Sequence, residues 1–372
     1  MKTAAFAVVL LLGATPASAQ LGKLGQIAKQ AEKLGDLSIS EQEERDLGER
    51  VSATVRTEFG VLQDAAVTKY VSLVGTVLAR ASSRPGLKWE FIVLDTDGVN
   101  AFAAPGGLVH ITKGALGLIK SESELAGVLG HEIAHVTKKH TVNAIKKSKA
   151  IKMTTDEMGA KGSAYYSKLA NAAYDNIVER GFDRGDERDA DEEGARIANK
   201  AGYNPAGLGT FLEKLIERNK GLGGSKPNGL FSTHPDTQAR IDELKQQIKS
   251  EKLSASAIGT ARYGASVKYD AKPVAAVALS NSAAKGVTGS GSAAKTEPKP
   301  EEKKKGGGMF GGLSSALSTG KQKEGTQASA SAGGRAVDSA RPDRYAAGGG
   351  NPNKITITLA AAEIETFKKG IA

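Results

Sequence analysis

The segment His131-Glu132-Ile133-Ala134-His135 constrains this chain more than any other part of the sequence. A spacing of four residues places both imidazoles on one face of a helix, one turn apart, so that they can bind a single metal ion. Glu132 lies beside them, where a carboxylate can act as a general base on water held by the metal without being a ligand itself. The alternative is an ordinary helix that carries two histidines. Gly127, Gly130 and the apolar neighbours predict a packed helix, in which these polar groups are expensive to bury without a function.

This helix is expected to begin at a capping box, Ser121-Glu122-Ser123-Glu124, and to extend to about Lys146. Leu129, Ile133 and Val136 are spaced to form its core face.

The hydrophobic periodicity and the turn residues of the remaining sequence predict more helix than strand. Further helices are expected over residues 21–35, 41–59, 65–81, 186–200, 206–219 and 235–250. Residues 88–94 and 108–112 have strand-like patterns, and 100–103 is a short extended segment before the break at Pro105-Gly106-Gly107. The expected fold is therefore α+β, a helical bundle with a small antiparallel sheet that has one exposed edge.

The N-terminal 19 residues have the pattern of a cleavable secretory signal. Lys2 precedes an apolar run from Ala4 to Leu12, and Ala17-Ser18-Ala19 supplies small residues for cleavage. The run is too short to span a bilayer, although an uncleaved anchor is the alternative, and no later stretch reaches about 18 apolar residues. We therefore expect an exported, soluble mature chain from residue 20, in a bacterial periplasm. The chain has no cysteine, which excludes thiolate ligands, disulfides and thiol catalysis.

The net charge of +10 comes from lysines that are spread along the chain, with no basic stripe interleaved with aromatic residues. This distribution argues against a nucleic-acid partner and favours solvated charge or contact with anionic envelope surfaces. After residue 250 the composition changes: residues 251–353 are expected to form a low-complexity, disordered tail. Residues 354–372 are expected to form a short strand and helix of unknown role.

The third ligand of a catalytic zinc is sought in the acidic segment Asp186–Gly194, because such a site needs three protein ligands and one open position. Glu187, Asp191, Gly194 and Ala198 share one helical face whose small residues permit a close approach to the first helix. A solvated acidic run is the alternative. In the metal-site interpretation, Asp191 lies outside the ligand shell and accepts the N–H of a ligand histidine.

The motifs taken together resemble those of peptidase family M48. The zinc-helix motif is followed by Glu187-x-x-Ala190-Asp191 and preceded by Asn100-Ala101-Phe102-Ala103-x-Pro-Gly-Gly, which resembles the edge-strand segment of the family. Thr233-His234-Pro235, with Arg240 after it, resembles the C-terminal His-Pro motif of the family. The resemblance covers about residues 36–250 and implies a mainly helical zincin domain of the gluzincin type, here over residues 20–250.

The resemblance also implies roles for individual residues. His131, His135 and Glu187 would bind one zinc ion per chain, and Glu132 would be the general base. His234 would approach the metal or the oxyanion, and in some family members a histidine here caps the zinc and keeps the enzyme latent. Arg240 would stabilise developing negative charge.

Residues Asn100, Ala101, Phe102 and Ala103 would bind an extended substrate by strand addition, although an ordinary sheet edge explains them equally well. His110 and His140 belong to no motif and are interpreted as structural or surface residues.

The function expected from the sequence is zinc-dependent endopeptidase activity on misfolded or unassembled envelope proteins. The absence of a membrane span and of a helical-repeat array distinguishes the chain from two branches of the family and weakens the inference about substrate. The first alternative is a zinc-bound chaperone or binding protein with latent or weak peptidase activity. A second alternative is an envelope-binding protein that works through its basic tail, with a structural zinc.

Overall fold

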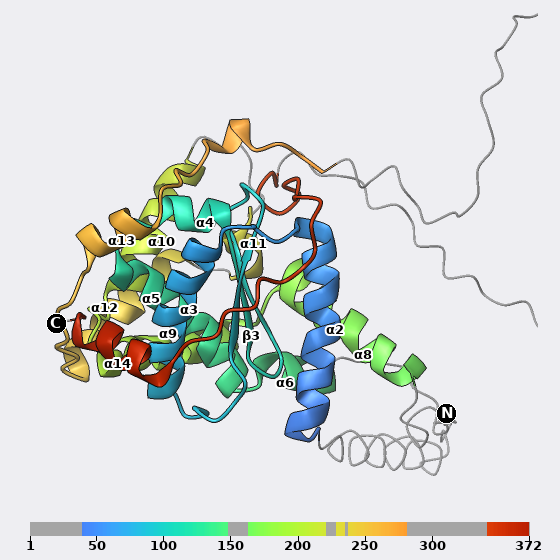
Figure 1. Cartoon of the computed structure of the whole chain (residues 1–372), viewed down its shortest axis with the longest axis horizontal. Coiled ribbons are helices and arrows are strands. Elements are labelled where there is room, and N and C mark those ends of the chain that lie inside the picture. The colour runs from blue at the N-terminus through green and yellow to red at the C-terminus, as the bar shows by residue number, and fades with distance from the viewer. Residues whose placement is uncertain (1–38, 148–162, 221–227, 235–236, 281–340, 372) are drawn as a thin grey trace, which may run out of the picture. The chain divides into compact units, whose positions relative to one another are not determined.

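The computed structural model describes residues 39–147, 163–220, 228–234, 237–280 and 341–371 (Figure 1). Within these ranges the fold is mainly helical with one small sheet, as the α+β expectation states. The expected signal segment and the helix over 21–35 lie outside the described residues. The elements are α2 (Glu41–Phe59), α3 (Ala65–Ala81), β1 (Glu90–Leu94), β2 (Ala101–Ala104), β3 (Leu108–Thr112), α4 (Lys113–Leu118), α5 (Glu122–Thr137), α6 (His140–Lys147), α8 (Ser163–Tyr174), the π-helix η1 (Asp175–Arg180), α9 (Arg184–Ala201), α10 (Gly207–Asn219), α11 (Leu230–Thr233), α12 (Thr237–Ser250), α13 (Thr260–Ser266), the 3₁₀ helix η2 (Val274–Ala276) and α14 (Ala361–Lys369).

The sheet is mixed, which corrects the expectation that it is antiparallel throughout. Its strand order is β1-β3-β2, with β2 antiparallel to β3 and β1 parallel to β3. Gly106 and Gly107, with φ of 72° and 93°, make the tight turn that joins β2 to β3 as a hairpin. This hairpin docks on β1 through its second strand, so β2 lies at the outer edge of the described sheet.

Side chains alternate along each strand, so both faces of the sheet carry apolar residues, and helices cover both faces. Phe91 and Val93 of β1 belong to a core shared with α3, α5, α9 and α10. Ile92 and Leu94, which point the other way, belong to a second core shared with α2, α8 and η1. Figure 1 shows the sheet between α3 on one side and α2 on the other. The two cores fix the position of the edge strand β2 next to α5.

Helix α5 begins as the sequence predicts but ends earlier. The hydroxyl of Ser121 caps it by accepting the backbone N–H of Glu124 at 3.3 Å. The helix stops at Thr137 and not near Lys146, because Lys139 adopts a left-handed conformation with φ of 57°. A separate helix, α6, then begins at His140.

Helix α9 crosses α5 at a point where both helices carry glycine. A Cβ on Gly194 would lie 2.8 Å from the backbone nitrogen of His131, and a Cβ on Gly130 would lie 3.0 Å from the carbonyl oxygen of Gly194. Any larger side chain would therefore separate the two helices. The small-residue face expected on residues 187–198 is the face that packs on α5.

Two C-terminal segments pack on the domain, one from the expected tail (251–280) and one from the expected C-terminal element (354–372). Tyr263 and Val267, near α13, and Ile364 and Ile371, in or after α14, are buried in the larger core. Residues 354–359 form no strand, although the helix expected after them is present as α14. These segments are poor in aromatic residues and rich in alanine, so their composition did not predict that they pack on the core. Residues 281–340, which hold most of the expected tail, lie outside the described ranges. Among the helices that the structure describes, none is both long and apolar enough to cross a membrane.

Buried His110 makes the stability of the fold depend on pH. Its side chain is fully buried in β3, Nε2 lies 2.8 Å from the Ser52 hydroxyl, and burial lowers the pKa of His110 to about 3. An unfolded histidine titrates near 6.5, so the unfolded chain binds the extra proton between these two values and stability falls as pH falls below about 6.5. Urea denaturation should show that this residue alone costs about 2 kcal/mol between pH 7 and pH 5. The difference between the two pH values should shrink by that amount in His110→Gln, and an equal difference in both proteins would contradict this prediction.

Candidate metal centre

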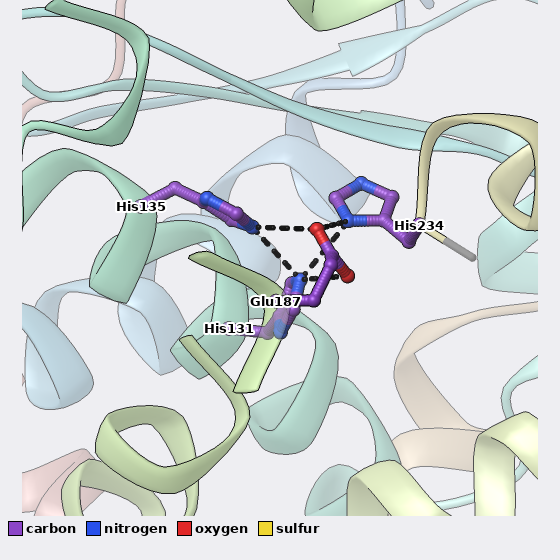
Figure 2. A group of neighbouring side chains, drawn as sticks. All are labelled: His131, His135, Glu187 and His234. Carbon is purple, nitrogen blue, oxygen red and sulfur yellow. Dashed lines mark hydrogen bonds and ion pairs between the residues drawn. The ribbon is translucent and has the colours of Figure 1, made fainter. Parts of the chain in front are cut away.

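Three helices bring four potential ligand side chains together (Figure 2). His131 and His135 project from α5, Glu187 from the first turn of α9, and His234 from the end of α11. One ligand atom from each of the four lies within 4.8 Å of every other, and all four side chains are buried. The close contact of α5 and α9 at their glycines is what carries Glu187 to the two histidines.

The distances among the first three groups have the size of a zinc coordination shell. The Nε2 atoms of His131 and His135 are 3.0 Å apart. Glu187 places Oε2 at 3.6 Å from His131 Nε2 and Oε1 at 3.4 Å from His135 Nε2. Ligands at 2.0–2.1 Å from a tetrahedral zinc are separated by about 3.3 Å. The nitrogen and oxygen donors therefore stand about as far apart as one ion requires.

The fourth corner of this arrangement is filled by His234. Its Nδ1 lies 3.1 Å from His131 Nε2 and 2.8 Å from Glu187 Oε1. Burial lowers the pKa of His234, but the negative charges of Glu187 and Glu132 outweigh burial and raise it. Pro235, the next residue of the His-Pro motif, lies outside the described residues.

Glu132 lies in the cluster without a fixed partner. The residue is 1% exposed, and neither carboxylate oxygen has a hydrogen-bond partner among the residues that the structure describes. Its Oε1 is 3.8 Å from His234 Nε2. Burial raises the pKa of Glu132 in spite of the nearby histidines. A carboxylate in this state can accept and release a proton with no competing hydrogen bond to break.

The ligand candidates are supported from behind by Asp191 and Arg240. Asp191 Oδ1 is 2.8 Å from His131 Nδ1, the nitrogen that faces away from the cluster. The guanidinium of Arg240 donates to both oxygens of Asp191 at 2.7 Å, and its Nη1 is 3.0 Å from Glu187 Oε2. Burial raises the pKa of each carboxylate, but for Asp191 the Arg240 charge and for Glu187 the His234 and Arg240 charges outweigh it and leave the pKa lowered. Both carboxylates are therefore ionised at neutral pH.

Two further residues surround His135 that the sequence did not mark as functional. His140 is buried, and its Nδ1 lies 2.9 Å from His135 Nδ1. The ring of Phe182 stacks on the ring of His135, with centroids 3.9 Å apart and planes inclined by 23°. In the sequence, His140 is distinguished only by following His135 by five residues. On a continuous helix that spacing would point the His140 side chain away from the metal.

The residues expected to bind an extended substrate lie on or next to the edge strand β2, at a distance in the sequence from the four candidate ligands. Ala101, Phe102 and Ala103 of β2 have buried side chains, and their backbone pairs with β3. The side chain of Asn100 accepts the backbone N–H of Ala101 at 3.0 Å and so caps the strand itself. These residues are 0–4% exposed, so the strand edge that the sequence predicts as exposed is covered in this structure. The substrate-binding role stays a prediction.

Comparison with known proteins gives a consistent result for the same region. Residues 65–248 match the model of peptidase family M48. The beta-barrel assembly-enhancing protease of Yersinia pestis is 26% identical over 226 residues, which cover 58% of this chain and 46% of that protein. The corresponding protease of Escherichia coli K12 is 27% identical over 223 residues, covering 56% and 45% of the two chains. The mitochondrial metalloendopeptidase OMA1 of Schizosaccharomyces pombe is 30% identical over 189 residues, covering 50% and 55%.

This chain spans about half the length of these relatives. The matched residues include α5, α9, α11 and most of α12, which together carry the whole buried cluster. The match, the relatives and the clustered motifs lead to one conclusion: the chain belongs to peptidase family M48, a family of metallopeptidases.

Proposed function

We propose that this protein is a zinc-dependent endopeptidase that hydrolyses misfolded or unassembled proteins of the bacterial envelope. The observation that carries the proposal is a buried set of two histidines and a glutamate at the spacing of a zinc shell, with an unpartnered glutamate beside it. A structural zinc site is closed by four protein ligands, as this site is while His234 stays in place, but it needs no unpartnered carboxylate such as that of Glu132.

The donor set fits zinc. Nitrogen and oxygen ligands are the ones that catalytic zinc uses when the protein offers no thiolate, and this chain has no cysteine. Burial lowers the pKa of His135 well below its usual value, so this imidazole is neutral and offers a lone pair. The ionised Glu187 would supply one negative charge to a dication, as in other sites with two histidines and one glutamate.

The roles of the residues follow from their positions. Zinc bound here would act as a Lewis acid, which polarises a peptide carbonyl and lowers the pKa of water. Glu132 takes the proton of the attacking water on its free carboxylate and then delivers it to the leaving amine nitrogen. Asp191 holds His131 through Nδ1, and Arg240 holds Asp191 and Glu187. These contacts favour a positioning role for Arg240 over the oxyanion stabilisation that the sequence suggested.

His234 is the residue that would control access to the ion. Its Nδ1 occupies the corner where a catalytic site keeps an open position. Cleavage therefore requires His234 to move away, and a chain in which it stays would be latent. This contact also supports the alternative function, a zinc-bound chaperone with weak peptidase activity.

The substrate class rests on three further features. The N-terminal signal pattern predicts export to the periplasm. The edge strand β2 would bind the backbone of an extended chain, a mode that suits unfolded proteins, once the groups that bury it move aside. Two of the relatives are named as proteases that enhance beta-barrel assembly. The basic C-terminal tail is a further expected contact for envelope partners, and its lysine run at 303–305 lies outside the described residues.

The test is cleavage of unfolded casein by the purified chain 20–372, loaded with zinc, beside His234→Ala. We expect slow cleavage by the wild type and cleavage several-fold faster by His234→Ala, because loss of the imidazole opens the fourth coordination position of the metal. His110→Gln, which alters a buried histidine outside the cluster, should cleave at the wild-type rate. Zinc binding without cleavage in either the wild type or His234→Ala would favour the chaperone function.

A further inference from the structure

The two histidines of α5 contact different partners through the nitrogens that face away from the cluster. His131 Nδ1 faces the carboxylate of Asp191 directly. His135 Nδ1 faces a third imidazole, that of His140, at 2.9 Å. His140 in turn places Nε2 at 3.3 Å from Asp189 Oδ2 and 3.9 Å from Asp186 Oδ1. The second ligand is thus connected to a carboxylate through an intervening ring.

The hydrogens along this chain of contacts can be assigned from one requirement. If His135 offers the lone pair of Nε2 to a metal, its hydrogen must be on Nδ1. His140 Nδ1 must then accept that hydrogen, and its own hydrogen must lie on Nε2, where it points at Asp189. The reverse assignment would put a hydrogen on His135 Nε2, in the space that the metal occupies. Asp189 therefore selects the tautomer of His140, and His140 in turn selects the tautomer of His135.

The backbone is bent where it places His140 in this position. Lys139 has φ of 57°, a conformation that a residue with a side chain adopts at some cost. The bend ends α5 after Thr137 and starts α6 at His140, so the imidazole folds back on His135 and not onto the outer surface. The hydrogen bond from Asn143 N to Lys139 O then begins the new helix.

We propose that His140 is a positioning residue that holds His135 in the tautomer and orientation needed to bind the metal, with Asp189 as the outer end of the chain. Phe182 supports the same ring from its face. This inference rests on the proposed metal site and concerns a residue that no motif identified. Partners of this kind typically contribute a factor of about 10 to 100 in metal affinity.

The test measures the zinc dissociation constant of the chain 20–372 by competition with a chromophoric chelator, in His140→Asn and His140→Gln. Asn keeps an acceptor oxygen near the position of Nδ1, whereas Gln places its polar atoms near Nε2 and leaves the Nδ1 position apolar. We expect His140→Gln to weaken zinc binding about 10- to 100-fold and His140→Asn to stay within about threefold of the wild type. His110→Gln, a change to another buried histidine, should leave the dissociation constant unchanged.

The outcomes separate this inference from the proposed function. A wild type that binds no zinc would overturn both. Tight zinc binding by the wild type and equally tight binding by His140→Gln would overturn only the role of His140. Equal losses in His140→Asn and His140→Gln would also overturn it, because a hydrogen-bond acceptor at Nδ1 would then be irrelevant. The d–d spectrum of the Co²⁺-loaded protein is a second readout, which should change in His140→Gln and not in His140→Asn.

Discussion

Glu132→Gln should reduce the rate of casein cleavage by about 10²- to 10⁴-fold while the protein still binds zinc, because Gln keeps the shape of Glu but cannot accept a proton. His234→Ala provides the open background in which this loss is easiest to measure. The comparison should therefore be made between His234→Ala and the double variant that also carries Glu132→Gln.

The same substitution should also stabilise the metal-free fold at neutral pH. Burial raises the pKa of Glu132, so the folded state disfavours its ionised form and loses stability as pH rises above the ordinary glutamate range. A neutral amide removes that penalty, and thermal denaturation in the presence of a chelator should show a higher midpoint. Glu193→Gln, on the partly exposed face of α9, is the matched control and should change neither activity nor stability. Cleavage at the wild-type rate by Glu132→Gln would exclude Glu132 as the base.

Arg240→Met should destabilise the metal-free protein by about 3–5 kcal/mol, measured by urea denaturation. Arg240 is 4% exposed, and its guanidinium pairs with two buried carboxylates, Asp191 and Glu187. Removing it takes away the main countercharge of Asp191 and one of the two charges that stabilise ionised Glu187, whereas Met fills a similar volume. Arg240→Lys should recover only part of the loss, because an ammonium cannot make the two parallel contacts to Asp191.

An exposed ion pair between the same two helices, α9 and α12, gives the matched control for this prediction. Arg188 makes two hydrogen bonds to Glu243 at the surface, and Arg188→Met should leave the free energy of unfolding nearly unchanged. A loss in Arg240→Met no larger than that in Arg188→Met would contradict the account of the buried pair. Zinc should reduce the difference between Arg240→Met and the wild type, because the dication replaces the countercharge of Glu187.

The sequence predicted those parts of the structure that depend on local pattern. The Ser121 cap, the spacing of His131 and His135, and the small face of α9 each follow from helical geometry, so the two helices and their contact could be foreseen. The spans of α2 and α3 agree with the expected ranges for the same reason.

What the sequence missed depends on contacts between distant segments or on unusual backbone. The bend at Lys139 has no signal, since a lysine in the left-handed region looks like any other helical lysine, and His140 was therefore not placed beside His135. The parallel pairing of β1 with β3 depends on how a hairpin docks, which strand patterns do not specify. The packing of Tyr263, in the expected tail, and of Ile364, in the expected C-terminal element, depends on single apolar residues whose partners lie far away in the sequence.

The most direct test of the central claim is the zinc content of the chelator-stripped and reloaded chain, measured by mass spectrometry in the wild type and in Glu187→Ala. The account predicts about one zinc ion per chain in the wild type and a large loss in Glu187→Ala, because one of three ligands is removed. Absence of zinc from the wild type, or equal zinc in both proteins, would contradict the assignment of His131, His135 and Glu187 as the metal site.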